Sequence, residues 1–291
     1  MRILIFGCGY LGGRVAAVWR EAGHEVLAVT RSSDRATELE HLGLTPVVAD
    51  VTRPETLSHL PQVDLCLYAV GFDRSGGASK REVYVQGLGH VLQHLVGRCS
   101  RLIYISSSSV YGQDAGEWVD ANSPCNPLTE SGEISLDAEN SVRGAAVQFP
   151  GGVEIVRLSG IYGPNRLLTR VDHLRAGQPL GGRPDAWLNL IHVADAATAV
   201  VRLSEQSGLP SSSRTFLLSD DAPVLRGDFY GLLAQLTNAP PPQFDTSLPT
   251  RSGGEGTGKR CCARIIKEIL GLQLEFPSFR DGLPQSLRES R

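Results

Sequence analysis

Three glycines near the start of the chain, Gly7, Gly9 and Gly12, follow the apolar run Ile3–Phe6 in the order Gly-x-Gly-x-x-Gly. The first permits a tight turn, the second lets a pyrophosphate approach the backbone, and the third lets the next helix pack against the strand. Free N–H groups at the start of that helix then face the phosphates. We therefore predict that a dinucleotide contacts Gly7, Gly9, Tyr10, Leu11 and Gly12.

An arginine follows the second strand-like run of the chain, where nucleotide-binding folds discriminate between cofactors. Enzymes that use NAD place an acidic side chain here for the ribose hydroxyls, whereas an arginine suits the 2′-phosphate of NADP. Arg31 occupies this position and Arg35 is close by in the sequence. We therefore predict NADP, with NAD as the second choice. The alternative interpretation of Arg31 is a solvated surface arginine.

The runs around the glycine loop alternate between strand and helix. Strand-like runs cover Ile3–Phe6, Val26–Thr30, Pro46–Ala49, Leu65–Ala69, Leu102–Ser106 and Val153–Leu158. Helical patterns cover Leu11–Ala22, Arg35–Leu42, Arg81–Val96 and Leu136–Val147. Nearly continuous apolar strands between amphipathic helices predict a parallel sheet covered on both faces, which is the doubly wound Rossmann α/β class.

The C-terminal part predicts a smaller, discontinuous substrate domain. Strand-like runs at Ala186–Ile191 and Thr215–Leu218 flank a helical run at Val193–Leu203, and an exposed loop at 238–258 precedes a last helix at Ala263–Leu270. We predict a nucleotide-binding domain of residues 1–165 plus 188–221. Residues 166–187 plus 222–291 form the predicted substrate-binding region.

Composition excludes several classes of protein. The net charge of −3 gives no basic footprint for nucleic acid, and no apolar run approaches the length of a membrane span. The six cysteines show no Cys-x-x-Cys pair and no metal-ligand spacing. Because the first strand begins at residue 2, we expect no signal peptide and a cytoplasmic protein. The expected partner is a small-molecule substrate, and a homodimer is left open.

Several motifs resemble those of extended short-chain dehydrogenases/reductases of the NAD-dependent epimerase/dehydratase type. The segment Ser106–Gly112 reads Ser-Ser-Ser-Ser-Val-Tyr-Gly, and Arg157–Pro164 is similar to the family's RLxGIYGP segment. Asn189–Asp195 is similar to its NxIHVxD segment. The segments Gly258–Arg260 and Phe276–Gly282 look like an atypical branch. The resemblance covers essentially the whole chain and is more specific for the fold than for the substrate.

The resemblance also implies roles for single residues. Ser107 matches the family's catalytic Ser/Thr; its alternative role is to satisfy backbone groups at the strand end. Tyr84 stands where the family's helix carries a structural asparagine, and it is either a catalytic phenol or an aromatic core residue. Asp50 resembles the family's adenine-contacting aspartate, with an N-cap or turn as the alternative. Further cofactor contacts are implied at Ala69, Ser106, Tyr162 and Gly163.

One family feature is missing. Members usually carry a Tyr-x-x-x-Lys pair about two dozen residues after the catalytic Ser or Thr, and the register here places Ser131 and Ser135 at those positions. The lysines are Lys80, Lys259 and Lys267, and no tyrosine lies four residues before any of them. General acid–base catalysis by such a pair contributes about 10²–10⁴ in rate. The proton-transfer half of the site is therefore either rebuilt or abandoned.

Two functions follow from this reading. The first is an atypical NAD(P)-dependent oxidoreductase or epimerase that acts on a sugar nucleotide or a similar polar small molecule, with Ser107 and Tyr84 as the candidate catalytic residues. The second is a catalytically silent NADP(H)-binding sensor or regulatory protein. The missing pair favours the second function. The retained segment Ser106–Gly112, called the serine turn below, and the retained second domain favour the first.

Overall fold

The computed structural model describes residues 1–73, 76–206, 212–248 and 256–290. Its centre is a seven-stranded sheet in the order β12-β7-β5-β4-β1-β2-β3. The pairings of β1 with β2 and β4, of β2 with β3, and of β4 with β5 are all parallel. The strands are β1 (Arg2–Phe6), β2 (Glu25–Thr30), β3 (Thr45–Val48), β4 (Val63–Tyr68), β5 (Cys99–Ser107), β7 (Val153–Leu158) and β12 (Ser213–Leu218).

The chain forms two compact units. Unit 1 comprises residues 1–106, 133–156 and 197–215, and unit 2 comprises residues 107–132, 157–196 and 216–291. By their contacts, residues 107–132, 157–165, 188–196 and 216–221 group with unit 2, whereas the predicted nucleotide-binding domain of residues 1–165 plus 188–221 includes them. Within unit 2 the strand β6 (Ala115–Val119) pairs with β15 (Gly258–Cys261), which ties the first of these segments to the C-terminal part of the chain.

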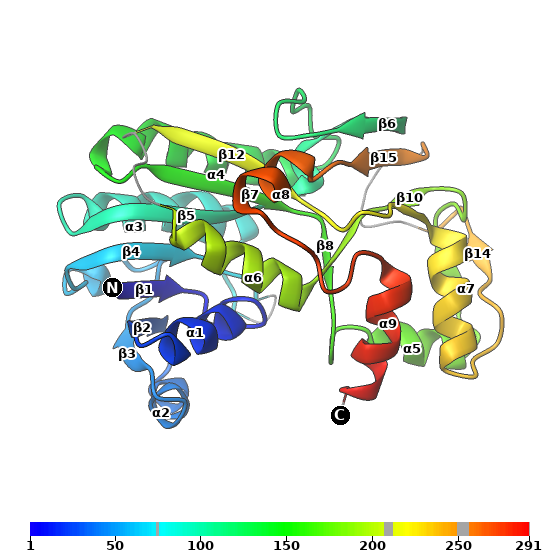
Figure 1. The fold of residues 1–291 in the computed structure, drawn as a ribbon, viewed down its shortest axis with the longest axis horizontal. Helices are drawn as coiled ribbons and strands as arrows, with labels where there is room; N and C mark the ends of the chain where they lie inside the picture. The colour runs from blue at the N-terminus through cyan, green and yellow to red at the C-terminus, as the bar shows by residue number, and fades with distance from the viewer. Residues whose placement is uncertain (74–75, 207–211, 249–255, 291) are drawn as a thin grey trace. The chain divides into compact units, whose positions relative to one another are not determined.

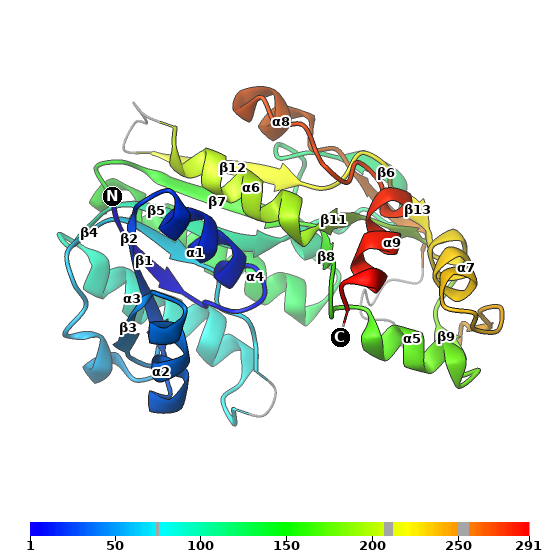
Figure 2. The ribbon, with the colours of Figure 1, turned by 60° about the horizontal axis from the view of Figure 1, so that its bottom comes forward.

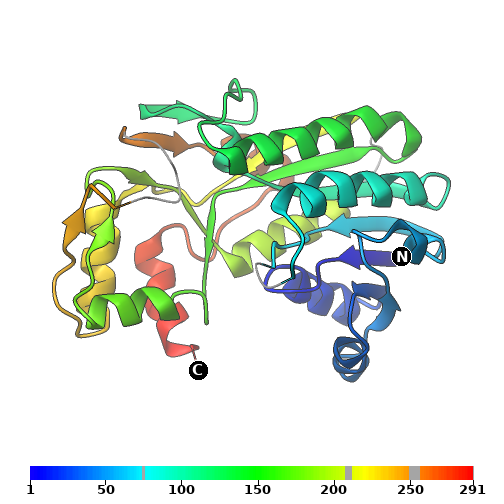
Figure 3. The same cartoon turned by 180° about the vertical axis from the view of Figure 1, so that it is seen from behind.

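Helices cover both faces of the sheet in unit 1. The helices are α1 (Gly12–Glu21), α2 (Ser33–His41), α3 (Gly87–Leu95), α4 (Glu130–Ala145) and α6 (Val193–Ser204), of which α4 and α6 also extend into unit 2. Figure 1 shows α1 and α6 in front of the strands, and Figure 3 shows α3 and α4 on the opposite face. The indole of Trp19 on α1 donates to Ser204 Oγ on α6 over 3.0 Å. The predicted doubly wound Rossmann class is confirmed.

Unit 2 combines short strands with helices. The strands not yet named are β8 (Gly160–Tyr162), β9 (Leu180–Gly181), β10 (Trp187–Leu188), β11 (Leu190–His192), β13 (Val224–Leu225) and β14 (Phe244–Asp245). The helices are α5 (Leu168–Arg175), α7 (Arg226–Leu236), α8 (Arg264–Leu270) and α9 (Phe279–Arg288). Figure 2 shows α5, α7 and α9 close together, around a core that contains Tyr162, Phe229 and Leu283.

The structure adds elements that the sequence did not predict. The run Ala186–Ile191 contains two short strands, β10 and β11, rather than one, and β6, α5, α7 and α9 were not predicted. Helix α9 contains Pro284, yet it begins at a capping box in which Ser278 and Asp281 bond each other's backbone N–H groups. Residues 249–255 of the predicted loop at 238–258 lie outside the described residues. No helix in the described ranges is long and apolar enough to cross a membrane.

Candidate functional site

The glycine loop has the geometry that its spacing predicts. β1 ends at Phe6 and α1 begins at Gly12. Gly7 has a φ of +87°, and an added Cβ there would lie 2.3 Å from the Ala69 carbonyl oxygen. A Cβ on Gly12 would lie 2.3 Å from the Gly7 carbonyl oxygen, whereas one on Gly9 would meet no atom within 4 Å. The outer two glycines are therefore required by packing, and the space in front of Gly9 is open.

A cavity of about 220 Å³ opens in unit 1 beside this loop. Its walls include Gly7 after β1, Thr30 at the end of β2, Arg31 after β2, Asp50 after β3, and Val70 after β4. Ligands of doubly wound sheets bind outside the carboxyl ends of the strands, where the strand order reverses. The cavity occupies this position, since β2 and β4 flank β1 on opposite sides. Among the predicted cofactor contacts, Gly7, Arg31 and Asp50 line it directly.

Two arginines stand at the edge of this cavity. The guanidinium of Arg31 donates to Asp73 Oδ2 over 3.0 Å, and both side chains are about half exposed. Arg35 donates to the Cys8 carbonyl over 3.3 Å and pairs with Glu38. An exposed ion pair is worth about 0–1 kcal/mol, so Arg31 can leave Asp73 for a stronger anion at little cost. Arg31 lines the cavity and has a carboxylate partner, yet its side chain is half exposed to solvent, as the alternative describes, so the 2′-phosphate contact stays a prediction.

Asp50 stabilises a turn and lines the cavity at once. Its Oδ1 accepts hydrogen bonds from the Thr52 N–H over 2.9 Å and from the Thr52 hydroxyl over 2.8 Å. These bonds match the turn role that was the alternative for this residue. Adenine contact stays a prediction, because the cavity position is compatible with it.

Ser106, at the end of β5, is held by a buried carboxylate that the sequence reading did not single out. Its hydroxyl donates to Glu139 Oε1 over 2.6 Å, and Arg143 donates to Glu139 Oε2 over 2.7 Å. Glu139 is fully buried. The signal in the sequence was the segment Leu136–Glu139, whose Leu-x-x-Glu pattern resembles the one that follows the lysine in the family and sets the register of Ser131 and Ser135. Ser106 therefore has a well-defined hydroxyl orientation within unit 1.

Tyr84 lies on an irregular turn that precedes α3. Residues Glu82–Gln86 form a π-helical turn, a feature that is frequent at functional sites. The Lys80 Nζ lies 5.4 Å from the centroid of the Tyr84 ring. Burial raises the pKa of the Tyr84 phenol, and a hydrogen bond to the Phe72 backbone offsets part of that rise. A lysine thus stands four residues before this tyrosine, in the reverse order of the family's usual pair, which a search for Tyr-x-x-x-Lys overlooks.

Ser107 lies in unit 2 and starts a short 3₁₀ turn, Ser108–Val110. Its Oγ accepts a hydrogen bond from the Ser109 N–H over 3.1 Å, so the backbone role that was its alternative is present. Tyr111 is buried directly after the turn, and its hydroxyl accepts a hydrogen bond from Arg157 over 2.9 Å. Burial raises the pKa of Tyr111 to about 12, although the Arg157 charge opposes the rise. The substrate-facing role of Ser107 stays a prediction.

The predicted cofactor contacts Tyr162 and Gly163 lie in unit 2. Tyr162 is fully buried in the core of this unit, and its hydroxyl donates to the Ser278 carbonyl over 3.2 Å. Its ring packs edge-on against His192, with 5.1 Å between centroids. Burial raises the pKa of Tyr162 far above the ordinary tyrosine value. Tyr162 is therefore a structural core residue of unit 2, and its cofactor contact stays a prediction.

The comparisons with known proteins agree with this geometry. The model of the NAD-dependent epimerase/dehydratase family matches residues 3–216. The chain belongs to this family. It is 28% identical to protein YeeZ of Escherichia coli K12, covering 95% of this chain and 96% of YeeZ. A Methylobacillus flagellatus structure, provisionally assigned as an NAD-dependent epimerase/dehydratase, is 28% identical with a TM-score of 0.78, over 99% and 97% of the two chains.

The structure of UDP-glucose 4-epimerase from Bifidobacterium longum, solved with NAD⁺ and UDP, has a similar fold at lower sequence identity. It has a TM-score of 0.81 and 17% identity, and the match covers 99% of this chain and 98% of that one. At this identity the likeness shows the fold.

The present chain departs from the pattern of its family on α4. Ser131 and Ser135 lie one turn apart on this helix, where the family's tyrosine and lysine are expected. Ser135 is buried, so the position offers little room for a lysine side chain. In the described ranges, no group of three His, Cys, Asp or Glu side chains could hold a metal ion. Candidate chemistry in this chain therefore depends on the cavity of unit 1, on Tyr84, and on the serine turn.

Proposed function

We propose that this protein binds a nicotinamide dinucleotide in unit 1 and transfers a hydride to or from a sugar nucleotide or a similar polar small molecule. The cavity beside the glycine loop carries this proposal, because it stands at the carboxyl ends of β1, β2, β3 and β4. Membership of an NAD-dependent family supports the cofactor class. The UDP bound to the B. longum neighbour supports a sugar nucleotide as substrate.

Two observations point to different forms of the cofactor. The family description and the NAD⁺ in the B. longum structure favour NAD. Arg31 and Arg35, both at the wall of the cavity, favour NADP because a 2′-phosphate would be a stronger partner for Arg31 than the exposed Asp73. A direct comparison of the two cofactors decides between them.

Tyr84 is the proposed proton donor and acceptor, and Ser107 is the proposed substrate hydrogen-bonding group. A serine hydroxyl alone has too high a pKa to replace the family's tyrosine, whereas a phenol beside an ammonium has the right chemistry. The Lys80 ammonium lies 5.4 Å from the centre of the Tyr84 ring, and this lysine–tyrosine proximity supports the assignment. The hydroxyl of Ser106 is already held by Glu139, which leaves Ser107 as the candidate of the serine turn.

A binding protein without catalysis is the second candidate function. The observation that favours it is the pair Ser131 and Ser135, which removes the family's proton-transfer residues from α4. In that case the cofactor state would control a partner. For either function we propose a cytoplasmic location, since none of the six cysteines forms a disulfide, as is typical of a reducing compartment.

Titration of NAD, NADH, NADP and NADPH into the purified protein by calorimetry tests the proposal first. We expect one cofactor pair to bind at least tenfold more tightly than the other. Sugar nucleotides are then screened for an absorbance change of the bound nicotinamide. An absorbance change supports the oxidoreductase or epimerase function, whereas tight cofactor binding without any absorbance change supports the binding protein. Absence of binding for all four cofactors contradicts both.

A further inference from the structure

A lysine from the C-terminal part of the chain lies beside the serine turn of unit 2. Lys259 belongs to β15, and its ammonium donates to the Tyr111 carbonyl over 2.9 Å. Tyr111 directly follows the turn Ser108–Val110 that Ser107 begins. The lysine side chain is partly buried, and an ammonium carries three N–H donors, so two remain beyond the bond to Tyr111.

The register of β15 directs Lys259 toward this turn. Side chains two residues apart in a strand share a face, so Lys259 and Cys261 project the same way. Cys261 hydrogen-bonds the Ser108 side chain, which places their shared face against the serine turn. The strand is fixed there by Asn189, whose side-chain amide donates to the Lys259 carbonyl over 2.8 Å and accepts from the Cys261 N–H over 2.6 Å.

The neighbouring residue shows that this orientation is specific. Arg260 projects to the other face, where its guanidinium lies 4.8 Å from the Trp118 ring and 5.3 Å from the Trp187 ring. Its Nε donates to the Gly116 carbonyl over 2.7 Å. Arg260 is thus a structural cation of the β6–β15 pair, whereas Lys259 alone of the two faces the serine turn.

The charge of Lys259 has no anionic partner among the described residues of the chain. The carboxylate of Asp114 acts on the Lys259 charge without forming an ion pair with it. It accepts hydrogen bonds from the Gly256 N–H over 2.9 Å and the Gly258 N–H over 3.2 Å. Burial lowers the pKa of Lys259, against the smaller opposing effects of Cys261 and Asp114. Desolvating a charge without a counter-ion is unfavourable, and such groups gather at functional sites.

We propose that Lys259 binds an anionic group of the substrate, a carboxylate or a phosphate, next to the serine turn. The inference rests on the proposed function and adds to it the charge of the ligand at this point. Such an anion would replace the water lost by the ammonium and would meet the two donors not used by Tyr111. A neutral donor would be enough to hydrogen-bond the Tyr111 carbonyl from β15. The proposal therefore explains why this donor carries a positive charge.

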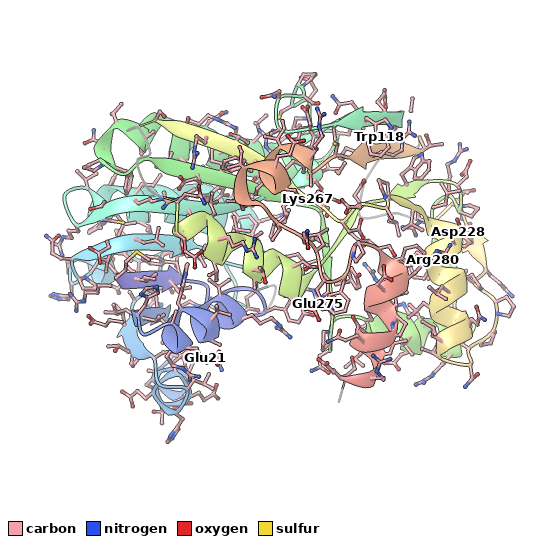
Figure 4. All side chains as sticks on the ribbon, viewed as in Figure 1. Glu21, Trp118, Asp228, Lys267, Glu275 and Arg280 are labelled. Carbon is pink, nitrogen blue, oxygen red and sulfur yellow. The ribbon has the colours of Figure 1, made fainter. Side chains whose placement is uncertain are left out.

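Variants of Lys259 separate the role of its charge from the role of its hydrogen bond to the Tyr111 carbonyl. Lys259→Gln keeps an N–H donor for Tyr111 and removes the charge, and Lys259→Arg keeps the charge. Lys267→Gln is the matched control, because this lysine lies on α8 (Figure 4) and forms an ion pair with Asp221. The probes are glucuronate, glucose 1-phosphate and glucose, each titrated by calorimetry with and without saturating NAD. Glucuronate and glucose 1-phosphate distinguish a carboxylate from a phosphate.

We expect at least one of the two anions to bind more tightly than glucose. A charge-assisted hydrogen bond is worth about 10- to 150-fold in affinity, and Lys259→Gln should lose that factor. Lys259→Arg and Lys267→Gln should keep most of the affinity, and NAD affinity should stay unchanged in all three variants. Equal anion affinity in Lys259→Gln and the wild type overturns the proposal, and so does a failure of both anions to bind.

The scarcity of lysines permits a second readout that does not depend on catalysis. The chain has only three lysines, so ¹³C-labelled lysine gives few Cε signals by NMR while the ammonium groups stay unmodified, and Lys259→Arg identifies the one of interest. We expect a bound anion to raise the pKa of this Lys259 signal, which burial lowers in the free protein. A Lys259 signal that ignores a saturating anion overturns the proposal. Absence of NAD binding, by contrast, contradicts the proposed function and leaves the titrations without NAD to decide on Lys259.

Discussion

The cavity of unit 1 is lined by residues that lie near one another in the sequence, whereas the serine turn of unit 2 is surrounded by residues that lie far apart in it. The cavity draws on the short stretch from Phe6 to Val83, in which each wall follows one strand of the sheet. The serine turn is surrounded by Tyr111, Arg157 and Lys259, which lie far apart in the chain. A site made of consecutive βα units is determined by local motifs, whereas a site made of distant segments depends on the tertiary fold.

The glycine loop gives the largest expected effects, and it splits into two predictions within one motif. Gly12→Val should destabilise the protein by about 1–3 kcal/mol or more, since a Cβ there would overlap the Gly7 carbonyl oxygen.

Gly9→Val should leave the melting temperature nearly unchanged and abolish dinucleotide binding, because its side chain would fill open space. Thermal unfolding and calorimetry on both variants check this. Tight binding by a folded Gly9→Val would mean that the dinucleotide site lies elsewhere.

Tyr84→Phe is expected to lower turnover by about 10²–10⁴, the usual contribution of a general acid or base. Cofactor affinity should stay unchanged, because Tyr84 does not line the cavity. Tyr68→Phe is the matched control: the Tyr68 hydroxyl is buried without a hydrogen-bond partner among the described residues, so its loss should not change turnover. An unchanged pH–rate profile in Tyr84→Phe would remove Tyr84 as the proton donor.

These two regions also show what the sequence could determine. The strand, glycine turn and helix at residues 2–21 follow from local apolar periodicity and from the steric needs of Gly7 and Gly12, so both fold class and cavity were predictable. The capped α9 was not predicted, because Pro284 normally ends a helix and the Ser278–Asp281 box was not sought. Lys259 could not be assigned to the serine turn, since only the pairing of β6 with β15 brings them together.

A smaller effect is expected for the arginine at the cavity wall. Arg31→Ala should weaken NADPH binding by about 10- to 150-fold if the cofactor is NADP, because one charge-assisted contact to the 2′-phosphate is lost. NADH affinity should change little, since the Arg31–Asp73 pair is exposed. Calorimetry with both cofactors measures the two ratios. Equal losses for both, or a wild type that prefers NADH, would exclude the 2′-phosphate contact.

A pH-dependent effect on stability is expected from a buried carboxyl of unit 2. Burial raises the pKa of Asp220 to about 8, so the folded protein holds a proton there that the unfolded chain releases near pH 4. Stability is then fully present below pH 4 and falls by up to about 1.4 kcal/mol for each pH unit as the pH rises toward 8. Asp220→Asn should flatten this part of the stability curve, measured by urea unfolding. A variant with the slope of the wild type would show that Asp220 does not titrate in this range.

The comparison between a retained cofactor half and a rebuilt proton-transfer half is tested most directly by restoring the family's pair. Hydride transfer is followed in a single turnover by nicotinamide absorbance, with the sugar nucleotide found in the screen, for the wild type and for Ser131→Tyr combined with Ser135→Lys. We predict that the double variant transfers hydride no faster than the wild type, because Ser135 is buried and Tyr84 is the proposed proton donor. An increase of about 10²–10⁴ in the double variant would contradict a rebuilt site.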